Sequence, residues 1–280
     1  MTLPKPFLEL SARIGSDPLQ IQGPGGNTSI KRDGTMHVKA SGTELADALR
    51  EPIFVAVDVA KARAELRGAG DGTCRAAMVD PNSPVRPSIE TTFHAMLDAS
   101  VVVHTHSVSA LAHLTSHEGT VAAERKLAGL SFASVPYAQP GLPLAREIED
   151  RMTPDTRVFL LRNHGLIVTG DDASEAGALL DEVEDRLALD ARSEPTVATL
   201  VADDRADASY WPDHVVFLGP GLPAVPPDGA NARAMLRCLA DVLARVDPEW
   251  IMQPLGADDV AALMNWDAET YRQAVAKQAR

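Results

Sequence analysis

The sequence is poor in cysteine and in positive charge, and it has no long apolar run. Only two cysteines, Cys74 and Cys238, occur in 280 residues, too few for a disulfide scaffold or a cysteine-rich zinc module and typical of a reducing compartment. The 26 Lys and Arg are outnumbered by 39 Asp and Glu, which gives a formal net charge of -13. A surface this acidic repels phosphate backbones and anionic lipids, so we expect neither a nucleic acid nor a membrane as a partner.

The start of the chain shows no targeting signal, because Met1–Pro6 leads into no apolar stretch of the signal-peptide type. No apolar run approaches the roughly 20 residues that a membrane-spanning helix needs. Hydrophobic residues make up 45% and charged residues 23% of the chain, as in ordinary globular proteins. We therefore expect a cytoplasmic protein that acts on a small molecule. An anionic substrate would need a local site that opposes the overall charge.

Short segments of strand and helix character alternate along the chain. Asp33 and Gly34, between two alternating segments, favour a tight hairpin turn. The interleaving predicts a mixed α/β fold, and the irregular helix spacing argues against a doubly wound sheet or a barrel. Helices are expected at 7–15, 88–98, 107–114, from Asp171 or Asp172 to Leu187, 229–247 and 257–278, and strands at 29–31, 36–39, 54–58, 101–106, 158–161, 166–169 and 215–218.

A histidine pair ends a strand-like run of valines. His104 and His106 follow Val101–Val103, and side chains two residues apart on a strand point to the same face, close enough to hold one ion. A His-x-His pattern also arises by chance, and alone it is better explained by two ordinary strand-end histidines. His164 lies in a turn sequence, Arg162–Gly165, between two expected strands. It is a third candidate ligand, because catalytic zinc commonly takes three protein ligands.

Glu90 is the candidate acid or base. It falls in the first turn of the helix expected from Ser88, where the helix dipole alone would favour a carboxylate. Close to a metal, the same group could ligate the ion or carry a proton. The other histidines show no such pattern: we expect surface positions for His113 and His117, and no partner is visible for His37, His94 and His214.

A glycine-rich loop, Gly23–Ser29, has the parts of an anion cradle. It is neither a Walker A nor a GxGxxG motif, but its glycines allow close backbone approach and its Asn, Thr and Ser side chains are donors. Backbone N–H groups in such loops bind phosphate without net positive charge. Ser41 and Gly42 offer a second set of donors, and Ser88 a third. Each of these segments is also compatible with an ordinary turn.

Five short motifs, taken in order, resemble the class II aldolase/adducin family. The motifs are Gly26–Ser29, Ser41–Gly42, Pro87–Glu90, His104–His106 and Arg162–Gly165, and the resemblance covers about residues 7 to 190. A nearer resemblance is to the aldolase portion of rhamnulose-phosphate aldolase/dehydrogenase fusion proteins, which share the longer form Gln22–Ser29 and a segment like Pro212–Val216. Each motif alone is weak, whereas five in the family's order are specific.

The resemblance implies an α/β/α layered fold, in which a central, mainly antiparallel sheet is flanked by helices. Residues 1–192 would form the catalytic core, with 193–280 as a C-terminal extension of one strand and two helices packed on the same domain. By resemblance, Zn²⁺ (or Mn²⁺, Co²⁺ or Ni²⁺) would be held by His104, His106 and His164, with Glu90 as a further ligand or as acid/base. Substrate and phosphate contacts would fall on Gly26, Asn27, Thr28, Ser41, Gly42 and Ser88. The resemblance also implies a homotetramer.

The reaction implied by this resemblance is carbon–carbon cleavage of the aldolase type, on a ketose phosphate or related hydroxy-carbonyl sugar derivative, through a metal-stabilised enediolate. The same kind of site supports decarboxylation of a 3-oxo sugar-acid phosphate, epimerisation or dehydration, and hydrolysis by zinc-bound water is a further alternative. A non-catalytic interaction module like adducin would have no use for the four metal-site residues. The chain departs from the family at Ile89, which replaces a second serine, and offers only Tyr137 as a counterpart of the aldolases' catalytic tyrosine.

Overall fold

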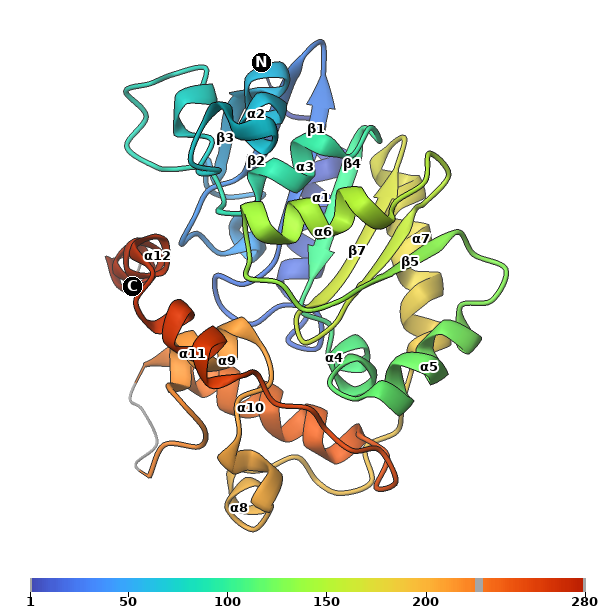
Figure 1. Cartoon of the computed structure of the whole chain (residues 1–280). Coiled ribbons are helices and arrows are strands. Elements are labelled where there is room, and N and C mark those ends of the chain that lie inside the picture. Colours follow the sequence, from blue (N-terminus) through green and yellow to red (C-terminus); the bar gives the residue numbers. More distant parts are fainter. Residues whose placement is uncertain (1, 225–228, 279–280) are drawn as a thin grey trace.

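A seven-stranded sheet lies at the centre of the computed structural model, which describes residues 2–224 and 229–278 (Figure 1). The strand order is β3-β2-β1-β4-β7-β6-β5, and neighbouring strands are antiparallel except β5 and β6. This confirms the expected α/β fold with a mainly antiparallel sheet flanked by helices. The strands are β1 (Asn27–Arg32), β2 (Thr35–Lys39), β3 (Phe54–Asp58), β4 (Val101–Thr105), β5 (Phe132–Val135), β6 (Val158–Leu161) and β7 (Gly165–Gly170). The α-helices are α1 (Lys5–Gly15), α2 (Val59–Ala64), α3 (Thr91–Met96), α4 (Val108–Leu114), α5 (His117–Lys126), α6 (Leu142–Arg151), α7 (Ala173–Leu187), α8 (Val197–Val201), α9 (Pro212–Leu218), α10 (Ala230–Arg245), α11 (Ala257–Met264) and α12 (Asp267–Gln278).

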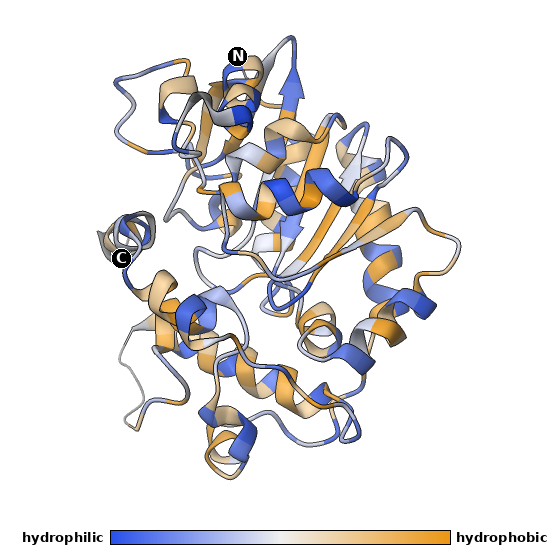
Figure 2. Ribbon diagram, viewed as in Figure 1, coloured by the Kyte–Doolittle hydropathy of each residue, from blue (hydrophilic) through white to orange (hydrophobic). Residues whose placement is uncertain are grey.

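Helices cover both faces of the sheet, and β4 shows how the sequence directs this. Val101 and Val103 of β4 face a core shared with α1 and α7, whereas Val102 packs on the opposite side with Phe93 of α3. The central strands are correspondingly apolar (Figure 2), and each fully buried side chain of this kind stabilises the fold by about 1.5–3 kcal/mol. Because neighbouring strand residues point to opposite faces, His104 lies on the Val102 side, against Phe93.

The pairing of β1 with β4 brings two candidate site residues together. Asn27, at the start of β1, lies opposite His104. β1 continues into a hairpin with β2 through the expected turn at Asp33 and Gly34, both of which have positive φ (51° and 76°). On its other side, the end of β4 pairs with the start of β7. The start of β1, the end of β4 and the start of β7 therefore meet at one edge of the sheet.

The chain after α7 packs on α4. Helix α4 buries Leu114 in the sheet core and Leu111 in a second apolar cluster, which includes Trp211 and Met235. Figure 1 shows α8 to α11 gathered below the sheet, beside α4. The indole nitrogen of Trp211 donates to the sulfur of Met235 at 3.2 Å, so the polar edge of this buried side chain is satisfied inside the cluster. Among the described residues, no helix has both the length and the apolar composition that membrane crossing needs.

Three expected elements differ from the structure. The segment 215–218, expected as a strand, lies in helix α9, where Pro212 opens the first turn and most side chains are buried. Packing of α9 in the interior outweighs the strand preference of its β-branched residues. The helix expected over 257–278 is two helices, α11 and α12, separated at Asn265 and Trp266. The helix expected over 88–98 spans only Thr91–Met96.

Two expectations about single residues are also wrong. Ser88 does not cap α3: Glu90 is the residue before its first turn, and the Ser88 hydroxyl accepts the N–H of Glu90 at 3.2 Å. His113, expected at the surface, is fully buried, and its Nδ1 donates to the backbone oxygen of Ser109 at 2.8 Å. The reason is that α4 has the sheet core on one side and the second cluster on the other. His117 is exposed, as expected.

Two buried histidines predict a loss of stability in acid. Burial lowers the pKa of His113 and of His214 from 6.5 to about 4. Between these pH values the unfolded chain takes up protons that the folded chain does not. Stability should therefore fall as the pH drops from 6.5 towards 4, by up to about 3 kcal/mol for each residue. Urea unfolding across this range checks the prediction. His113→Gln and His214→Gln should each flatten the pH dependence, and an unchanged slope in both variants would contradict it.

Candidate metal centre

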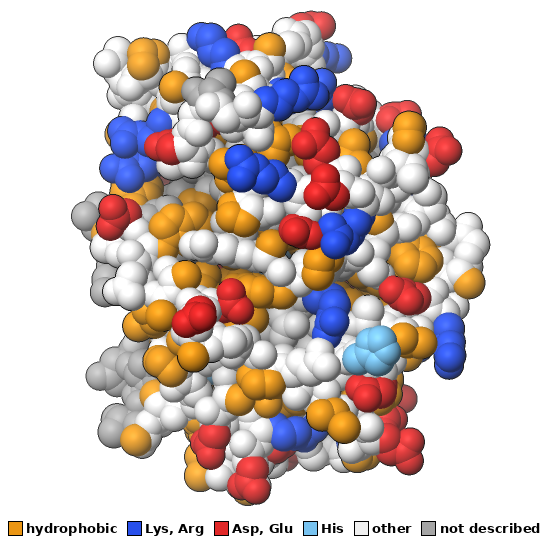
Figure 3. All heavy atoms as spheres, viewed as in Figure 1, with side chains coloured by type: hydrophobic (Ala, Val, Ile, Leu, Met, Phe, Trp, Pro, Cys, Tyr) orange, Lys and Arg blue, Asp and Glu red, His pale blue; other side chains and the backbone are white. Residues whose placement is uncertain are grey.

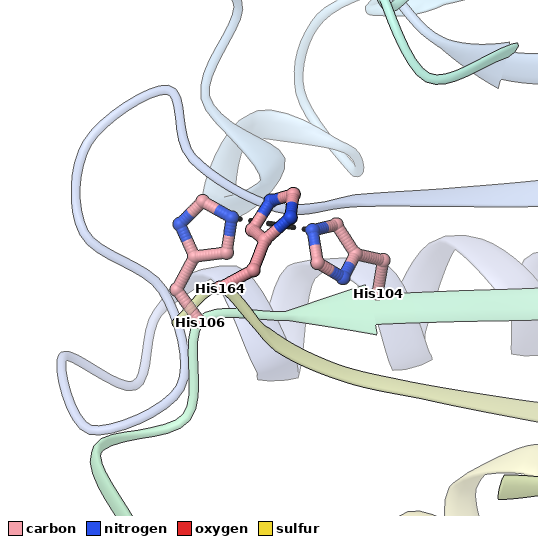
Figure 4. Close-up of side chains that lie close together, drawn as sticks. All are labelled: His104, His106 and His164. Atoms are coloured by element: carbon pink, nitrogen blue, oxygen red, sulfur yellow. Dashed lines mark hydrogen bonds between the residues drawn. The ribbon is translucent and has the colours of Figure 1, made fainter. Parts of the chain in front are cut away.

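Three histidines converge where β4 meets the β6–β7 turn. His104 lies in β4, His106 directly follows it, and His164 comes from the turn. One nitrogen of each ring lies within 4.8 Å of the others, and all three side chains are buried (Figure 4). The turn approaches β4 this closely because position 165 is glycine: a Cβ on Gly165 would lie 2.2 Å from the backbone oxygen of Thr105. The three candidate ligands thus meet in space, although one lies about 60 positions from the others in the sequence.

Hydrogen bonding determines which nitrogen His104 presents to the cluster. Its Nδ1 lies 3.0 Å from the backbone oxygen of Leu166, which can only accept, so Nδ1 carries the proton and Nε2 a lone pair. Nε2 of His106 lies 3.2 Å from Nε2 of His104, and Figure 4 marks this contact with a dashed line. Burial lowers the pKa of His104 and lowers that of His164 to about 3, so both rings are neutral near pH 7. Neutral imidazoles are the form that binds a metal.

Glu90, at the start of α3, places its carboxylate against two of the histidines. Its Oε2 lies 3.5 Å from Nε2 of His104, and its Oε1 lies 3.3 Å from Nε2 of His164. Asn27 donates from Nδ2 to Oε2 at 2.8 Å, while Oε1 has no hydrogen-bond partner among the described residues. Burial by itself would raise the pKa of Glu90, but His104, His164 and the Asn27 amide outweigh burial and lower the pKa to about 2. The group is therefore ionised at neutral pH.

This donor set fits a divalent metal ion. Ligand atoms about 2.1 Å from a tetrahedral zinc lie about 3.4 Å apart. The separations are 3.2 Å between Nε2 of His104 and of His106, and 3.5 and 3.3 Å from the Glu90 oxygens to His104 and His164. Two lone pairs facing each other at such a distance are unfavourable unless a proton or a cation lies between them. Imidazoles with a carboxylate suit zinc and other first-row divalent ions.

A buried hydrogen-bonded chain supports Glu90 and includes a histidine that the sequence pattern did not single out. His94 of α3 lies between Ser29, whose Oγ is 2.8 Å from its Nδ1, and Asn27, whose Oδ1 contacts its Nε2. Asn27 in turn donates to Glu90 and, at 3.2 Å, to the Ser88 hydroxyl. With the proton of His94 on Nε2, every contact is satisfied and the Asn27 NH₂ group faces Glu90. The sequence does contain one signal for His94: it lies four residues after Glu90, and residues at this spacing share one face of a helix.

Replacing His94 with phenylalanine is expected to lower kcat about 10- to 100-fold, because Asn27 would no longer be held against Glu90. Unfolding should become easier by about 1–3 kcal/mol, since Asn27 and Ser29 would lose a buried partner. His94→Gln retains a donor amide and should recover part of both losses. Urea unfolding and steady-state kinetics check this. An unchanged kcat in His94→Phe would show that Asn27 needs no support from His94.

The loop residues expected to bind phosphate are only partly brought together. Asn27 and Ser88 lie at the site, where they bond to each other and to Glu90. Thr28 points to the opposite face of the sheet, and its hydroxyl lies 2.7 Å from that of Ser11 in α1. Alternation along β1 separates Thr28 from Asn27 in this way. The structure therefore does not place the Thr28 hydroxyl at the site.

Ser41 and Gly42 follow β2 in a loop that α12 covers. A Cβ on Gly42 would come within 2.6 Å of the Val275 side chain, so the helix packs directly on this loop. The Ser41 hydroxyl is buried and has no hydrogen-bond partner in the described part of the chain. Ser41 lines a pocket of about 260 Å³ together with Arg86 and Ile89.

The glycine-rich loop packs on the histidine pair. A Cβ on Gly26 would lie 2.7 Å from the backbone oxygen of His104. At Gly25, a Cβ would lie 2.8 Å from Oδ2 of Asp213 and 2.9 Å from Nδ1 of His106. The glycines here serve close packing of the loop over the candidate ligands, a role different from the phosphate cradle that the sequence suggested.

The buried side chain of Lys39 forms hydrogen bonds with both candidate anion-binding loops. Its Nζ donates to the backbone oxygens of Pro24, at 2.9 Å, and of Thr43, at 2.7 Å. Burial and the charge of Arg272 lower the pKa of Lys39 to about 7, against the opposing effect of Asp213. No sequence pattern marks this buried amine, and with a pKa of about 7 it is only partly charged near neutral pH.

Asp213 of α9 brings the C-terminal part of the chain to the histidines. Its Oδ2 lies 3.1 Å from Nδ1 of His106, and its Oδ1 contacts the guanidinium of Arg272 in α12. Burial would raise the pKa of Asp213, but Arg272 and His106 outweigh it and hold the pKa far below its usual range. The sequence marked the segment Pro212–Val216 only through the resemblance, and assigned Asp213 no role.

Tyr137 lies in a separate apolar cluster. It packs with Val215 and Leu263, and its hydroxyl is buried with no hydrogen-bond partner among the residues described. Burial and Asp259 raise the pKa of this hydroxyl far above its usual value. In the described part of the chain, no hydrogen bond therefore links Tyr137 to the histidine cluster.

The chain belongs to the class II aldolase and adducin family. The family model described as "Class II Aldolase and Adducin N-terminal domain" matches residues 14–189. This range includes Glu90 and the three histidines and ends before α8, so α8 to α12 lie outside the matched region.

Similar proteins carry several different names. Over 189 residues the chain is 31% identical to the "Uncharacterized oxidoreductase YuxG" of Bacillus subtilis, a match that covers 60% of this chain and 27% of that protein. It is 31% identical over 117 residues to the 3-oxo-tetronate 4-phosphate decarboxylase of Haemophilus influenzae, covering 37% and 55%. With the L-fuculose phosphate aldolase of Methanocaldococcus jannaschii it is 24% identical over 193 residues, covering 66% and 93%. The chain thus spans only part of the first two relatives.

A solved structure has a similar fold. The N-terminal class II aldolase domain of a conserved protein from Thermoplasma acidophilum superimposes with a TM-score of 0.57 at 28% sequence identity, over 67% of this chain and 94% of that one. The family is therefore established for this chain, whereas its particular reaction depends on the details of the site.

Proposed function

We propose that the protein is a metal-dependent carbon–carbon lyase of the aldolase type, acting on a ketose phosphate or a related hydroxy-carbonyl sugar derivative. The observation that carries the proposal is the carboxylate of Glu90, buried between His104 and His164 at 3.5 and 3.3 Å. Class II aldolases depend on a divalent metal, and zinc or another first-row ion fits His104, His106 and His164. When bound, the ion polarises the substrate carbonyl and its neighbouring hydroxyl and stabilises the negative charge that cleavage leaves there.

Glu90 is the residue that we propose to move the proton. Its Oε2 is held by Asn27, whereas Oε1 has no hydrogen-bond partner among the described residues and faces the histidines. Oε1 is therefore the atom that could take a proton from the substrate hydroxyl or return one to the carbon left by cleavage. A positioned acid or base of this kind contributes about 10²- to 10⁴-fold to the rate.

We further propose that the pocket beside Ser41 receives the phosphate or another polar end of the substrate. Arg75 and Arg86 line it together with Ser41, whose buried hydroxyl has no hydrogen-bond partner among the described residues. Figure 3 shows basic and acidic side chains intermixed on one face of the molecule, so the net charge of -13 does not form a uniform acidic surface there. Local arginines can therefore attract an anion despite the overall charge.

A decarboxylase of a 3-oxo sugar-acid phosphate is the second candidate. The similarity to a 3-oxo-tetronate 4-phosphate decarboxylase favours it, and decarboxylation also leaves negative charge on an oxygen beside the reacting carbon. Epimerisation at the same site would break and re-form the bond that an aldolase breaks. A non-catalytic module is disfavoured, because a buried carboxylate among three buried imidazoles is costly without a function.

The test is metal analysis followed by a substrate panel. Protein loaded with Zn²⁺, Mn²⁺, Co²⁺ or Ni²⁺ is assayed with ketose phosphates and 3-oxo acid phosphates, and release of aldehyde or of CO₂ is measured. We expect about one divalent ion per chain and aldehyde release. Release of CO₂ alone selects the decarboxylase, and an isomeric sugar phosphate selects the epimerase. Protein that binds no divalent ion and turns over none of these substrates would overturn the proposal.

We also propose a homotetramer in the cytoplasm, with a catalytic core over residues 1–192 and the extension 193–280 packed on it. Contacts of α10 with α4 support the packing of the extension. Light scattering after size-exclusion chromatography should give about four times the chain mass of 29.8 kDa. A mass equal to that of a single chain would contradict the tetramer.

A further inference from the structure

We propose that Asp213 is a positioning residue that sets which nitrogen of His106 is available for a metal ion. This places part of the metal centre in the chain beyond residue 189, outside the matched family region. The inference rests on the proposed metal-dependent function. Its evidence is a contact between a buried carboxylate and the outer nitrogen of one candidate ligand.

The contact involves two buried atoms that face only each other. Oδ2 of Asp213 lies 3.1 Å from Nδ1 of His106, and the two side chains are 2% and 4% exposed. In the described part of the chain neither atom makes a hydrogen bond of regular geometry, even to the other, so the 3.1 Å contact is a close approach of two buried polar atoms that have no other partner. Gly25 closes the site from the other side, since a Cβ there would collide with both atoms. Because a carboxylate only accepts, this geometry favours the tautomer of His106 with its proton on Nδ1.

The choice of tautomer matters because His106 and His104 lie so close together. Nε2 of His104 carries a lone pair, since its Nδ1 bonds to Leu166. If His106 carried its proton on Nε2, it would donate to this lone pair across 3.2 Å. The two rings would then satisfy each other and withhold both nitrogens from a metal. With the proton on Nδ1, both lone pairs are directed to the same place.

Asp213 is itself held in place by a residue almost 60 positions later. Arg272 of α12 contacts Oδ1, which leaves Oδ2 for His106, and the guanidinium lies 5.2 Å from the ring centre of Phe217. An arginine beside the carboxylate compensates its buried charge. Arg272 would also fix the orientation of an asparagine side chain at position 213. The amide oxygen would stay on the arginine, and the NH₂ group would point to His106.

The decisive variant is therefore Asp213→Asn. Its NH₂ group would donate to Nδ1 of His106 and move the ring proton to Nε2, the tautomer that withholds both nitrogens. We expect the affinity for Zn²⁺ and for Co²⁺, measured by competition with a chelator, to fall about 10- to 100-fold. The visible spectrum of the Co²⁺-loaded variant should change as well, because one ligand would be displaced or distorted.

Asp241→Asn is the matched control. Asp241 is also a buried carboxylate of the C-terminal segment, but it pairs with Arg237 and Arg245 on its own helix, each at 2.7 Å. This variant should lose thermal stability without losing metal affinity. Wild-type affinity in Asp213→Asn, or an equal loss of affinity in Asp241→Asn, would overturn the role of Asp213.

If Asp213→Asn does not fold, a measurement on the wild-type protein tests the same inference. In ¹⁵N-histidine-labelled, Zn²⁺-loaded protein, the Nδ1 proton of His106 should resonate far downfield and exchange slowly with water, as expected for a proton bonded to a buried carboxylate. A proton that exchanges rapidly would overturn the inference. If the wild type binds no divalent ion, this inference and the proposed function fail together. If it binds one and Asp213→Asn binds it equally well, only this inference fails.

Discussion

Glu90→Gln is expected to lower kcat about 10²- to 10⁴-fold and to leave about one divalent ion per chain in place. Glutamine has the shape of glutamate and can still accept from Asn27, but it cannot exchange a proton at the position of Oε1. The three histidines remain to hold the ion. Since the change affects the chemical step, KM should change far less than kcat. Steady-state kinetics on the substrate identified by the panel, with metal analysis of the same sample, check this.

Glu124→Gln provides the comparison. Glu124 of α5 is a partly buried glutamate that accepts from Ser134 at 2.5 Å, as Glu90 accepts from Asn27, and it comes from a different part of the fold. Its replacement should leave kcat near the wild-type value. If Glu90→Gln retained full activity, proton transfer by Glu90 would be excluded, whatever the metal content of the protein.

His164→Ala is expected to weaken divalent metal binding by more than about 100-fold and to abolish turnover. The reason is that His164 is the cluster histidine supplied by the β6–β7 turn, and its removal leaves only two imidazoles and one carboxylate to hold the ion. Metal content after dialysis and competition with a chelator are the measurements. The circular dichroism spectrum of the variant should match that of the wild type, which shows that the loss of metal is not a loss of the fold.

His117→Ala serves as the control for a histidine replacement. His117 opens α5 and is exposed, so its loss should alter neither metal content nor turnover. Stoichiometric metal in His164→Ala would show that the ion does not need the turn residue. That result would leave the His104–His106 pair as the centre and would contradict the three-histidine site.

The histidine cluster was predictable from the sequence because its geometry is mostly local. Alternation along β4 places His104 and His106 on one face, and a turn between two strands carries His164 back to them. Six of the seven strands were predictable for the same reason, since strand patterns and the Asp33–Gly34 turn depend on neighbouring residues, whereas β5 was not expected. Local pattern also explains the error at 215–218, because β-branched residues favour strands until packing decides otherwise.

Residues that act through distant partners were not predictable in this way. Asp213 approaches His106 only because α4 holds the C-terminal helices beside the sheet. Lys39 is buried because two loops close over it, and His113 because α4 is covered on both sides. None of these contacts leaves a period or a motif in the sequence. Thr28 shows the reverse case, in which a motif was read as one functional unit although its residues point to opposite faces.

The pairing of Asn27 with His104 links function to strand alignment. Sliding β1 along β4 by a single residue would turn Asn27 towards α1 and bring Thr28 to its place, so Glu90 would lose its amide while most of the apolar sheet persisted. Extra residues at Asp33–Gly34 should be harmless, since the far end of the hairpin points away from the histidines. An insertion within β1 itself should instead yield a folded but inactive protein.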